Sequence, residues 1–153
     1  MTRIKAWSRA VGHDHEMEQT TQSAHELMLA SLEAVAAADV DLVPRFFARF
    51  YGAHPQDRAM FHNPGSSHGA MVNEIMDTLL ALASGEEWVE LMLRNQVRTH
   101  HDHGDIPLDR YAQALDLFLD VLADAAGPAW TADCQHAWRA QADRMMAIIT
   151  RWY

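Results

Sequence analysis

The stretch that decides the fold of this chain is Phe61-His62-Asn63-Pro64-Gly65-Ser66-Ser67-His68. Proline and glycine together break a preceding helix and form a turn. A serine at position 66 or 67 can then cap the helix that follows, which places His68 near its start. The stretch therefore predicts a turn led by an aromatic residue and a lone histidine at the opening of a helix.

Helical periodicity continues on both sides of this turn. Before it, a capping box at Ser23 predicts a helix to about residue 38, and apolar spacing predicts a second helix over residues 42–51. After it, the same spacing predicts helices that end at Ser84-Gly85, at the histidines of residues 100–103 and at Gly127-Pro128, and a last one that begins at Thr131. No alternating β-branched run indicates a strand. We therefore expect an all-α protein of six to eight helices.

Length and composition indicate one globular domain. The chain has 153 residues, of which 49% are hydrophobic and 22% are charged, the balance of an ordinary folded protein. We assign residues 23–153 to this domain and residues 1–22 to a polar N-terminal extension, whose His13 and His15 are weak chelators at most. We expect a monomer or a small homo-oligomer.

Charge and cysteine content restrict the partners and the compartment. The formal net charge is −9 and the basic residues form no stripe, so we expect no binding to nucleic acid. Cys134 is the only cysteine, which rules out an internal disulfide and indicates a reducing compartment. No apolar run approaches the ~20 residues of a membrane span, and the first residues lack the apolar core of a signal peptide. We expect a cytoplasmic protein without a membrane partner, and an inert thiol at Cys134.

A second constellation gathers histidines ahead of a tyrosine. The sequence reads His100-His101-Asp102-His103, and Tyr111 stands ten residues after the second of these histidines. A di-iron bundle is not indicated, because no glutamate is followed three positions later by a histidine. Phe61 lies seven residues before His68, and Phe47 lies fourteen residues before Phe61. These positions suit the apolar wall of a pocket for a planar cofactor.

Further motifs carry a family resemblance. They are Arg45-Phe46-Phe47-Ala48-Arg49-Phe50, His54-Pro55, the Phe61 turn and Ala137-Trp138. Over residues 23–153 the chain resembles bacterial single-domain globins of the flavohaemoglobin type. The resemblance implies a globin fold, with helices around a pocket for haem b (iron protoporphyrin IX).

The resemblance also implies roles for particular residues. Phe61 packs against the haem, His68 lies on the distal side as a hydrogen-bond donor or sixth iron ligand, and Val72 crowds the bound gas. The proximal histidine of such globins stands ten residues before a tyrosine, which assigns the iron to His101. The remaining haem contacts are Phe47, Val97 and Tyr111.

His100 is the alternative iron ligand. The family often places a glycine four residues after its proximal histidine, and Gly104 has that spacing only from His100. Helical phase favours His101, because Val97 and Leu93 lie four and eight positions before it on the same side. We expect His103 and the other member of the pair to be exposed or to meet a haem propionate.

The implied function is reversible binding of oxygen, nitric oxide or carbon monoxide, without catalytic residues. The alternative is a nitric oxide dioxygenase or peroxidase-like enzyme that needs a separate reductase. Relatives with that activity often carry a tyrosine where Phe47 stands and a glutamate near the position of Tyr153, so this chain lacks part of their catalytic set. A third hypothesis is a cofactor-free module that acts through protein contacts.

Overall fold

The computed structural model describes residues 22–153, which form six α-helices and two short 3-10 helices. The elements are α1 (Ala24–Ala37), α2 (Leu42–Ala53), η1 (Pro55–Met60), α3 (Pro64–Ser84), α4 (Val89–Gly104), α5 (Leu108–Ala126), η2 (Gly127–Ala129) and α6 (Ala132–Trp152). No strand occurs within residues 22–153, so the predicted all-α class is confirmed. The predicted extension, with His13 and His15, lies almost wholly outside the described residues.

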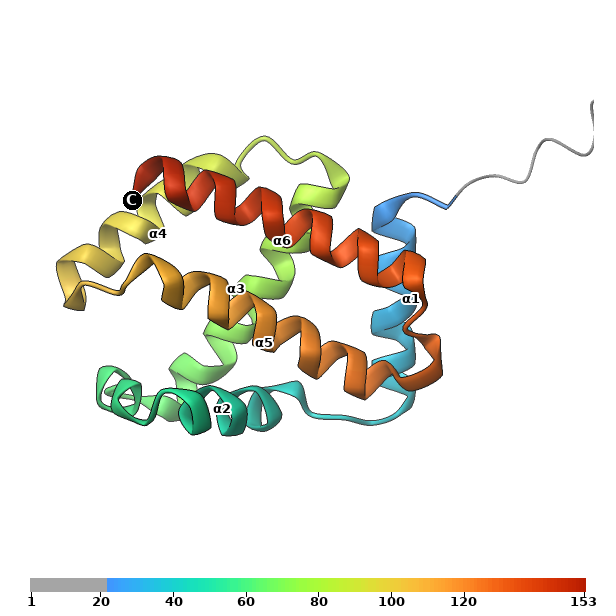
Figure 1. Cartoon of the computed structure of the whole chain (residues 1–153), viewed down its shortest axis with the longest axis horizontal. Coiled ribbons are helices and arrows are strands. Elements are labelled where there is room, and N and C mark those ends of the chain that lie inside the picture. Colours follow the sequence, from blue (N-terminus) through green and yellow to red (C-terminus); the bar gives the residue numbers. More distant parts are fainter. Residues whose placement is uncertain (1–21) are drawn as a thin grey trace, which may run out of the picture.

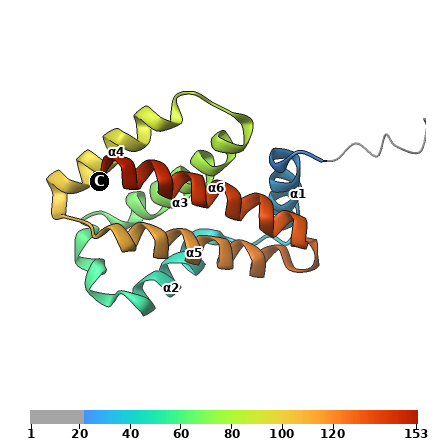
Figure 2. The ribbon, with the colours of Figure 1, turned by 45° about the horizontal axis from the view of Figure 1, so that its top comes forward.

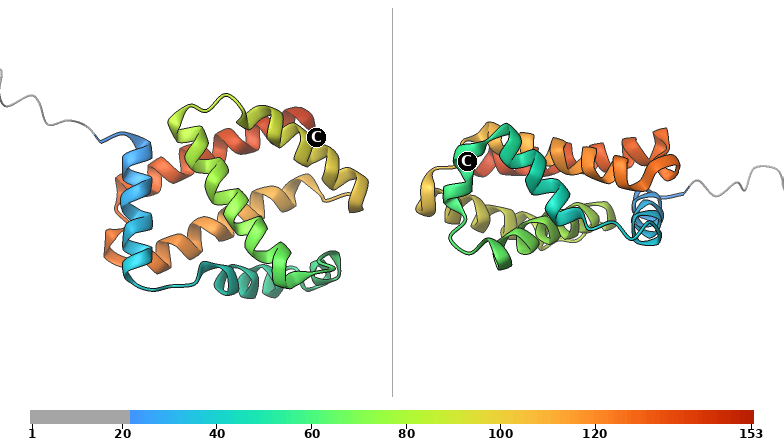
Figure 3. Two further views of the ribbon diagram at one scale, coloured as in Figure 1. Left: turned by 180° about the vertical axis from the view of Figure 1, so that it is seen from behind. Right: turned by 90° about the horizontal axis from the view of Figure 1, so that it is seen from below.

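Helices α5 and α6 lie side by side and antiparallel through the middle of the molecule (Figure 1). Seen from behind, α3 crosses this pair, and the C-terminal end of α6 lies beside α4 (Figure 3). Helix α1 packs against α6 and α5 at the far end, and α2 runs along α5 (Figure 2). The end of the molecule away from α1 is thus enclosed by α3, α4 and α5. Among the described helices, none is both long and apolar enough to cross a membrane.

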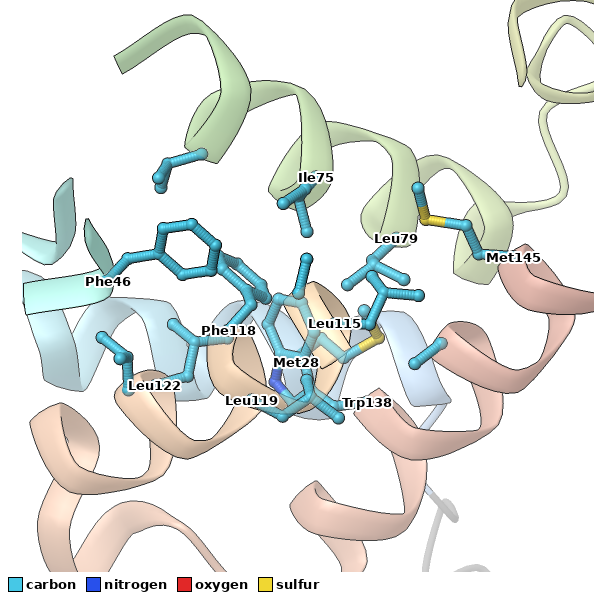
Figure 4. Packing of buried hydrophobic residues seen from close by; sticks show 14 of the residues in the cluster. Met28, Phe46, Ile75, Leu79, Leu115, Phe118, Leu119, Leu122, Trp138 and Met145 are labelled. Atoms are coloured by element: carbon cyan, nitrogen blue, oxygen red, sulfur yellow. The ribbon is translucent and has the colours of Figure 1, made fainter. Parts of the chain in front are cut away.

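The core fills the crossing of α3 with α5 and α6. Figure 4 shows Ile75 and Leu79 of α3 above Phe118 of α5, with Trp138 of α6 beneath them. Leu79 and Trp138 have no exposed surface. Because each such side chain stabilises the fold by about 1.5–3 kcal/mol on burial, this crossing fixes how α3 lies over α5 and α6.

The ends of the helices follow local sequence signals at most points. The Ser23 hydroxyl accepts from the backbone N–H of Glu26 at 3.1 Å, which confirms the predicted cap of α1. Gly85 adopts a left-handed φ of 76° and ends α3 where predicted, since glycine enters that region without a steric cost.

The predicted cap of α3 is wrong. Helix α3 begins at Pro64, because proline has its φ preset for a first helical residue and needs no hydrogen-bond acceptor there. The hydroxyls of Ser66 and Ser67 therefore lie inside the first turn and donate back to the carbonyl oxygen of Asn63, at 3.4 and 2.8 Å.

Candidate functional site

A cavity of about 330 Å³ lies between α3, α4 and α5, and residues of α2, η1 and α6 complete its wall. Such a volume falls in the range of about 300–1,000 Å³ that is typical of small-molecule and cofactor sites. Its apolar wall includes Phe50, Phe61, Met71, Ile75, Leu115, Met145 and Ile149. Its polar groups include Asp57, Glu74, Gln96, His100, His103, Arg110 and Tyr111. The cavity is thus largely apolar, with two imidazoles and a phenol on the α4 and α5 side.

His100 is the histidine that α4 holds against this cavity by a hydrogen bond. Its Nδ1 lies 2.7 Å from the hydroxyl oxygen of Tyr111 on α5. Burial lowers the pKa of His100, and nearby His103 and His101 lower it further. Burial, and to a smaller extent the nearby Tyr153 side chain, raises the pKa of Tyr111 to about 12. The site therefore offers a neutral imidazole whose Nδ1 is fixed by a protonated phenol, while its Nε2 can donate a lone pair to a metal.

The structure does not bring His101 to the cavity. Its Nδ1 lies 3.3 Å from a carboxylate oxygen of Asp105, and its Nε2 lies 3.3 Å from the backbone oxygen of Tyr153. Leu93 and Val97 are indeed on its side of α4, but they are buried in the core. The apolar face of α4 packs on α6, while the cavity lies on the neighbouring face that carries Gln96 and His100. The helical phase that favoured His101 therefore identified the face of α4 that packs in the core, not the face that lines the cavity.

His68 lies in a separate groove on the other side of Phe61. Its Nε2 lies 2.5 Å from the hydroxyl oxygen of Tyr51, and its ring stacks on Phe47 with 3.6 Å between centroids. Phe47 lines that groove as well. Val72 and Val97 are core residues with 2% and 1% exposure.

Of the residues expected to meet the cofactor, Phe61 and Tyr111 line the cavity, and the alternative ligand His100 joins them. The sequence analysis did not assign Met71 and Ile75 to the site, although both line the cavity from α3. Their four-residue spacing was a usable signal, but it competed with the equal spacing of His68 and Val72.

An ion pair at the cavity wall was also missed. Nε of Arg110 lies 2.9 Å from a carboxylate oxygen of Asp57, with side-chain exposures of 17% and 9%. Arg110 also contacts the imidazole of His54. The pair joins η1 to the start of α5, so it fixes the end of the cavity that lies beside Phe61.

No direct metal site accompanies these groups: within residues 22–153, no cluster of three or more His, Cys, Asp or Glu side chains is arranged to hold a metal ion. The arrangement is that of a helical protein with an apolar cofactor cavity and one imidazole fixed in its wall.

The comparisons with known proteins agree with this description. A family model described as Globin matches residues 44–149. The match covers α2 to α6 and therefore every element that forms the cavity. The chain belongs to the globin family, whose members bind haem and small gas ligands, and the predicted globin fold is confirmed. No curated protein sequence matches the chain.

Proposed function

We propose that this chain is a bacterial single-domain globin of the flavohaemoglobin type, which binds haem b in the cavity between α3, α4 and α5. In this proposal His100 is the proximal iron ligand, and oxygen, nitric oxide or carbon monoxide is the reversible ligand. The observation that carries it is the hydrogen bond of 2.7 Å between Nδ1 of His100 and Tyr111.

The residues of the cavity suit a haem. The porphyrin is a flat apolar ring, and Phe61, Met71 and Ile75 supply apolar contact for it. His103, an exposed residue at the cavity, suits a propionate carboxylate. When bound, the haem supplies an iron whose sixth position is open to a diatomic gas. Tyr111 orients the imidazole and fixes which ring nitrogen carries the proton.

The α3 side of the cavity favours a carrier or sensor over an enzyme. Met71 and Ile75 face the cavity there, and the imidazole of His68 does not. These apolar side chains exclude water and donate no hydrogen bond to a bound gas. Phe47 lacks a hydroxyl, so it supplies no donor of its own. A separate reductase would keep the iron ferrous.

Visible spectra of the purified protein in ferric, ferrous and oxygenated states test this proposal. We expect a Soret band that shifts with oxygen, collapses in His100→Ala and persists in His101→Ala and His68→Ala. Collapse in His101→Ala alone would reassign the ligand. Loss of a bis-histidine spectrum in His68→Ala would restore His68 as a sixth ligand. A protein without a Soret band after haem addition would act as a cofactor-free module.

A further inference from the structure

Three large hydrophobic side chains are exposed where the start of α4 lies beside the end of α6. Leu91 is 61% exposed, Trp88 49% and Trp152 39%. Arg94 lies between them, because its guanidinium carbon is 4.7 Å from the centroid of the Trp152 ring and it stands three positions after Leu91 on α4. We call Trp88, Leu91, Arg94 and Trp152 the α4–α6 face. Exposed hydrophobic residues that occur singly need no explanation, but a group of them marks a contact surface.

The α4–α6 face is held in one shape. Arg151 of α6 donates to a carboxylate oxygen of Glu90 on α4 at 2.6 Å. Together with the contact of Arg94 on Trp152, this ion pair fixes the end of α6 along α4, where the two helices lie side by side (Figure 3). None of the four residues of the face lines the cavity between α3, α4 and α5, so an occupant of the face leaves that cavity free.

Charges follow a definite order along this side of α4. Glu87 lies in the turn just before the helix, four positions ahead of Leu91, and Arg98 lies seven positions after Leu91. These spacings place all three residues on one side of the helix. Glu87 and Arg98 are exposed, and the ion pairs found within residues 22–153 include neither of them. This side is thus acidic at its beginning, apolar at Leu91 and basic towards its end.

Such a side is complementary to itself when a second copy packs against it with its α4 reversed. In a dimer with a two-fold axis, each contact between two different residues occurs twice, once in each direction. With the axis between Leu91 and Arg94, Glu87 of each copy faces Arg98 of the other, and the two Leu91 side chains meet near the axis. The chain carries a net charge of −9, so two copies repel each other over much of their surface. On this side, in contrast, opposite charges meet.

We propose that the α4–α6 face is the interface of a homodimer, in which two copies of this chain pack their α4 helices antiparallel about a two-fold axis beside Leu91. An aromatic side chain can bury about 150–250 Å², so the exposed parts of Trp88 and Trp152 offer roughly 150–200 Å² per copy. This area suits the apolar centre of a small interface, well below the ~2,000 Å² at which obligate interfaces begin. The dimer is therefore reversible, with a dissociation constant in the micromolar range, and it does not depend on haem.

Sedimentation equilibrium of the full chain, from the low micromolar to the millimolar range, tests the dimer. We expect the average mass to rise from 17.3 kDa towards twice that value. Leu91→Arg adds like charges beside the axis and should keep the mass of a single chain throughout this range. Leu29→Arg is the matched control, because Leu29 is also exposed but lies on α1. It should associate like the wild type.

Two charge-reversed variants test whether the partner is a second copy. Glu87→Arg and Arg98→Glu each oppose like charges across the axis, so each variant alone should associate at least about tenfold more weakly. An equal mixture of the two should dimerise again, since each variant supplies the charge that the other lacks. Glu33→Arg makes the same reversal at an exposed position of α1 and should change nothing. Far-UV circular dichroism should match the wild type in every variant, because all the substituted side chains are exposed.

Each of three results would overturn the proposal. A wild-type chain that keeps the mass of one chain up to the millimolar range forms no dimer. A dimer that persists unchanged in Leu91→Arg is formed by another surface. If the mixture of Glu87→Arg and Arg98→Glu associates no better than either variant alone, the two charges do not face each other and the face belongs to a different partner.

Discussion

Nδ1 of His100 and the hydroxyl oxygen of Tyr111 lie 2.7 Å apart, across the gap between α4 and α5. The two residues stand eleven positions apart in the sequence, with the turn at residues 105–107 between them. The hydrogen bond therefore ties the orientation of the imidazole to the packing of the next helix.

Tyr111→Phe should weaken haem binding without abolishing it. The variant keeps the ring but removes the partner that fixes the proton on Nδ1 and makes Nε2 a stronger donor. Loss of such an outer partner costs about 10–100-fold in metal affinity, so we expect haem loss to a scavenging apoprotein to accelerate by about tenfold or more. The iron–histidine stretching frequency in resonance Raman spectra should fall as well.

Tyr153→Phe is the control for this variant. The Tyr153 hydroxyl donates to the carbonyl oxygen of Ile106 at 3.1 Å and makes no hydrogen bond to His100. Its haem retention and Raman frequency should match the wild type. Equal effects of both variants would mean that Tyr111 supports the cavity only by packing.

Residues close together in the sequence determine where most helices of this protein begin and end. The Ser23 hydroxyl caps α1 by accepting a hydrogen bond from the backbone N–H of Glu26, and the left-handed backbone conformation of Gly85 ends α3. Such signals involve neighbouring residues, so the sequence predicts them well. The α3 start was misassigned only because a serine cap and a first-turn proline compete in the same stretch.

The site depends on distant contacts that local patterns do not contain. His100 and His101 differ by one position, which turns a side chain by about 100° around the helix. Which of them faces the cavity is decided by how α4 packs on α6, including the contact of His101 with Tyr153, fifty-two residues later. The same holds for His68, whose direction is set by Tyr51 and Phe47 on α2.

Ser31→Ala should destabilise the fold measurably. The Trp138 indole N–H donates to the Ser31 hydroxyl at 2.9 Å, and that hydroxyl donates to the carbonyl oxygen of Met28 at 2.6 Å. Trp138 is fully buried, so the variant leaves its N–H without a partner. We expect the free energy of unfolding to drop by about 1–3 kcal/mol in urea denaturation.

Ser84→Ala is the matched control for Ser31. Its hydroxyl also donates to a backbone oxygen, that of Ala81 at 3.2 Å, but Ser84 is exposed and accepts no hydrogen bond from an indole. We expect a change within about 0.5 kcal/mol. A double variant with Trp138→Phe should lose less than the sum of the two single variants, because both partners are then absent.

Cys134 should resist thiol reagents in the native protein. It has 2% exposure, and burial raises the pKa of its thiol, an effect that contacts with Ser31 and Trp138 only partly offset. At pH 8 we expect no reaction with a disulfide reagent until guanidinium unfolds the chain. Rapid labelling of native protein would show that the N-terminal turn of α6 opens readily.

The same shift predicts a loss of stability at high pH. Above the ordinary thiol pKa of about 8.5, the unfolded chain gives up its proton while the folded chain retains it. The free energy of unfolding should therefore fall as the pH rises from about 8.5 through the raised native value. Cys134→Ala should remove this part of the pH dependence, which urea denaturation at several pH values measures.

Met71→Gln should slow the release of oxygen from the haem-loaded protein. Met71 lines the cavity from α3, where wild type presents no amide or imidazole donor. Glutamine has a similar length and adds an N–H₂ donor, and a hydrogen bond to a bound gas is worth about 1 kcal/mol. Since 1.4 kcal/mol corresponds to a factor of ten, stopped-flow measurements should show oxygen leaving about fivefold more slowly. Carbon monoxide carries little charge when bound and should leave at nearly the wild-type rate. Met71→Leu changes the shape of the side chain without adding a donor, so the ratio of the oxygen and carbon monoxide release rates should stay at the wild-type value. If Met71→Gln also keeps the wild-type ratio, residue 71 does not contact the bound gas.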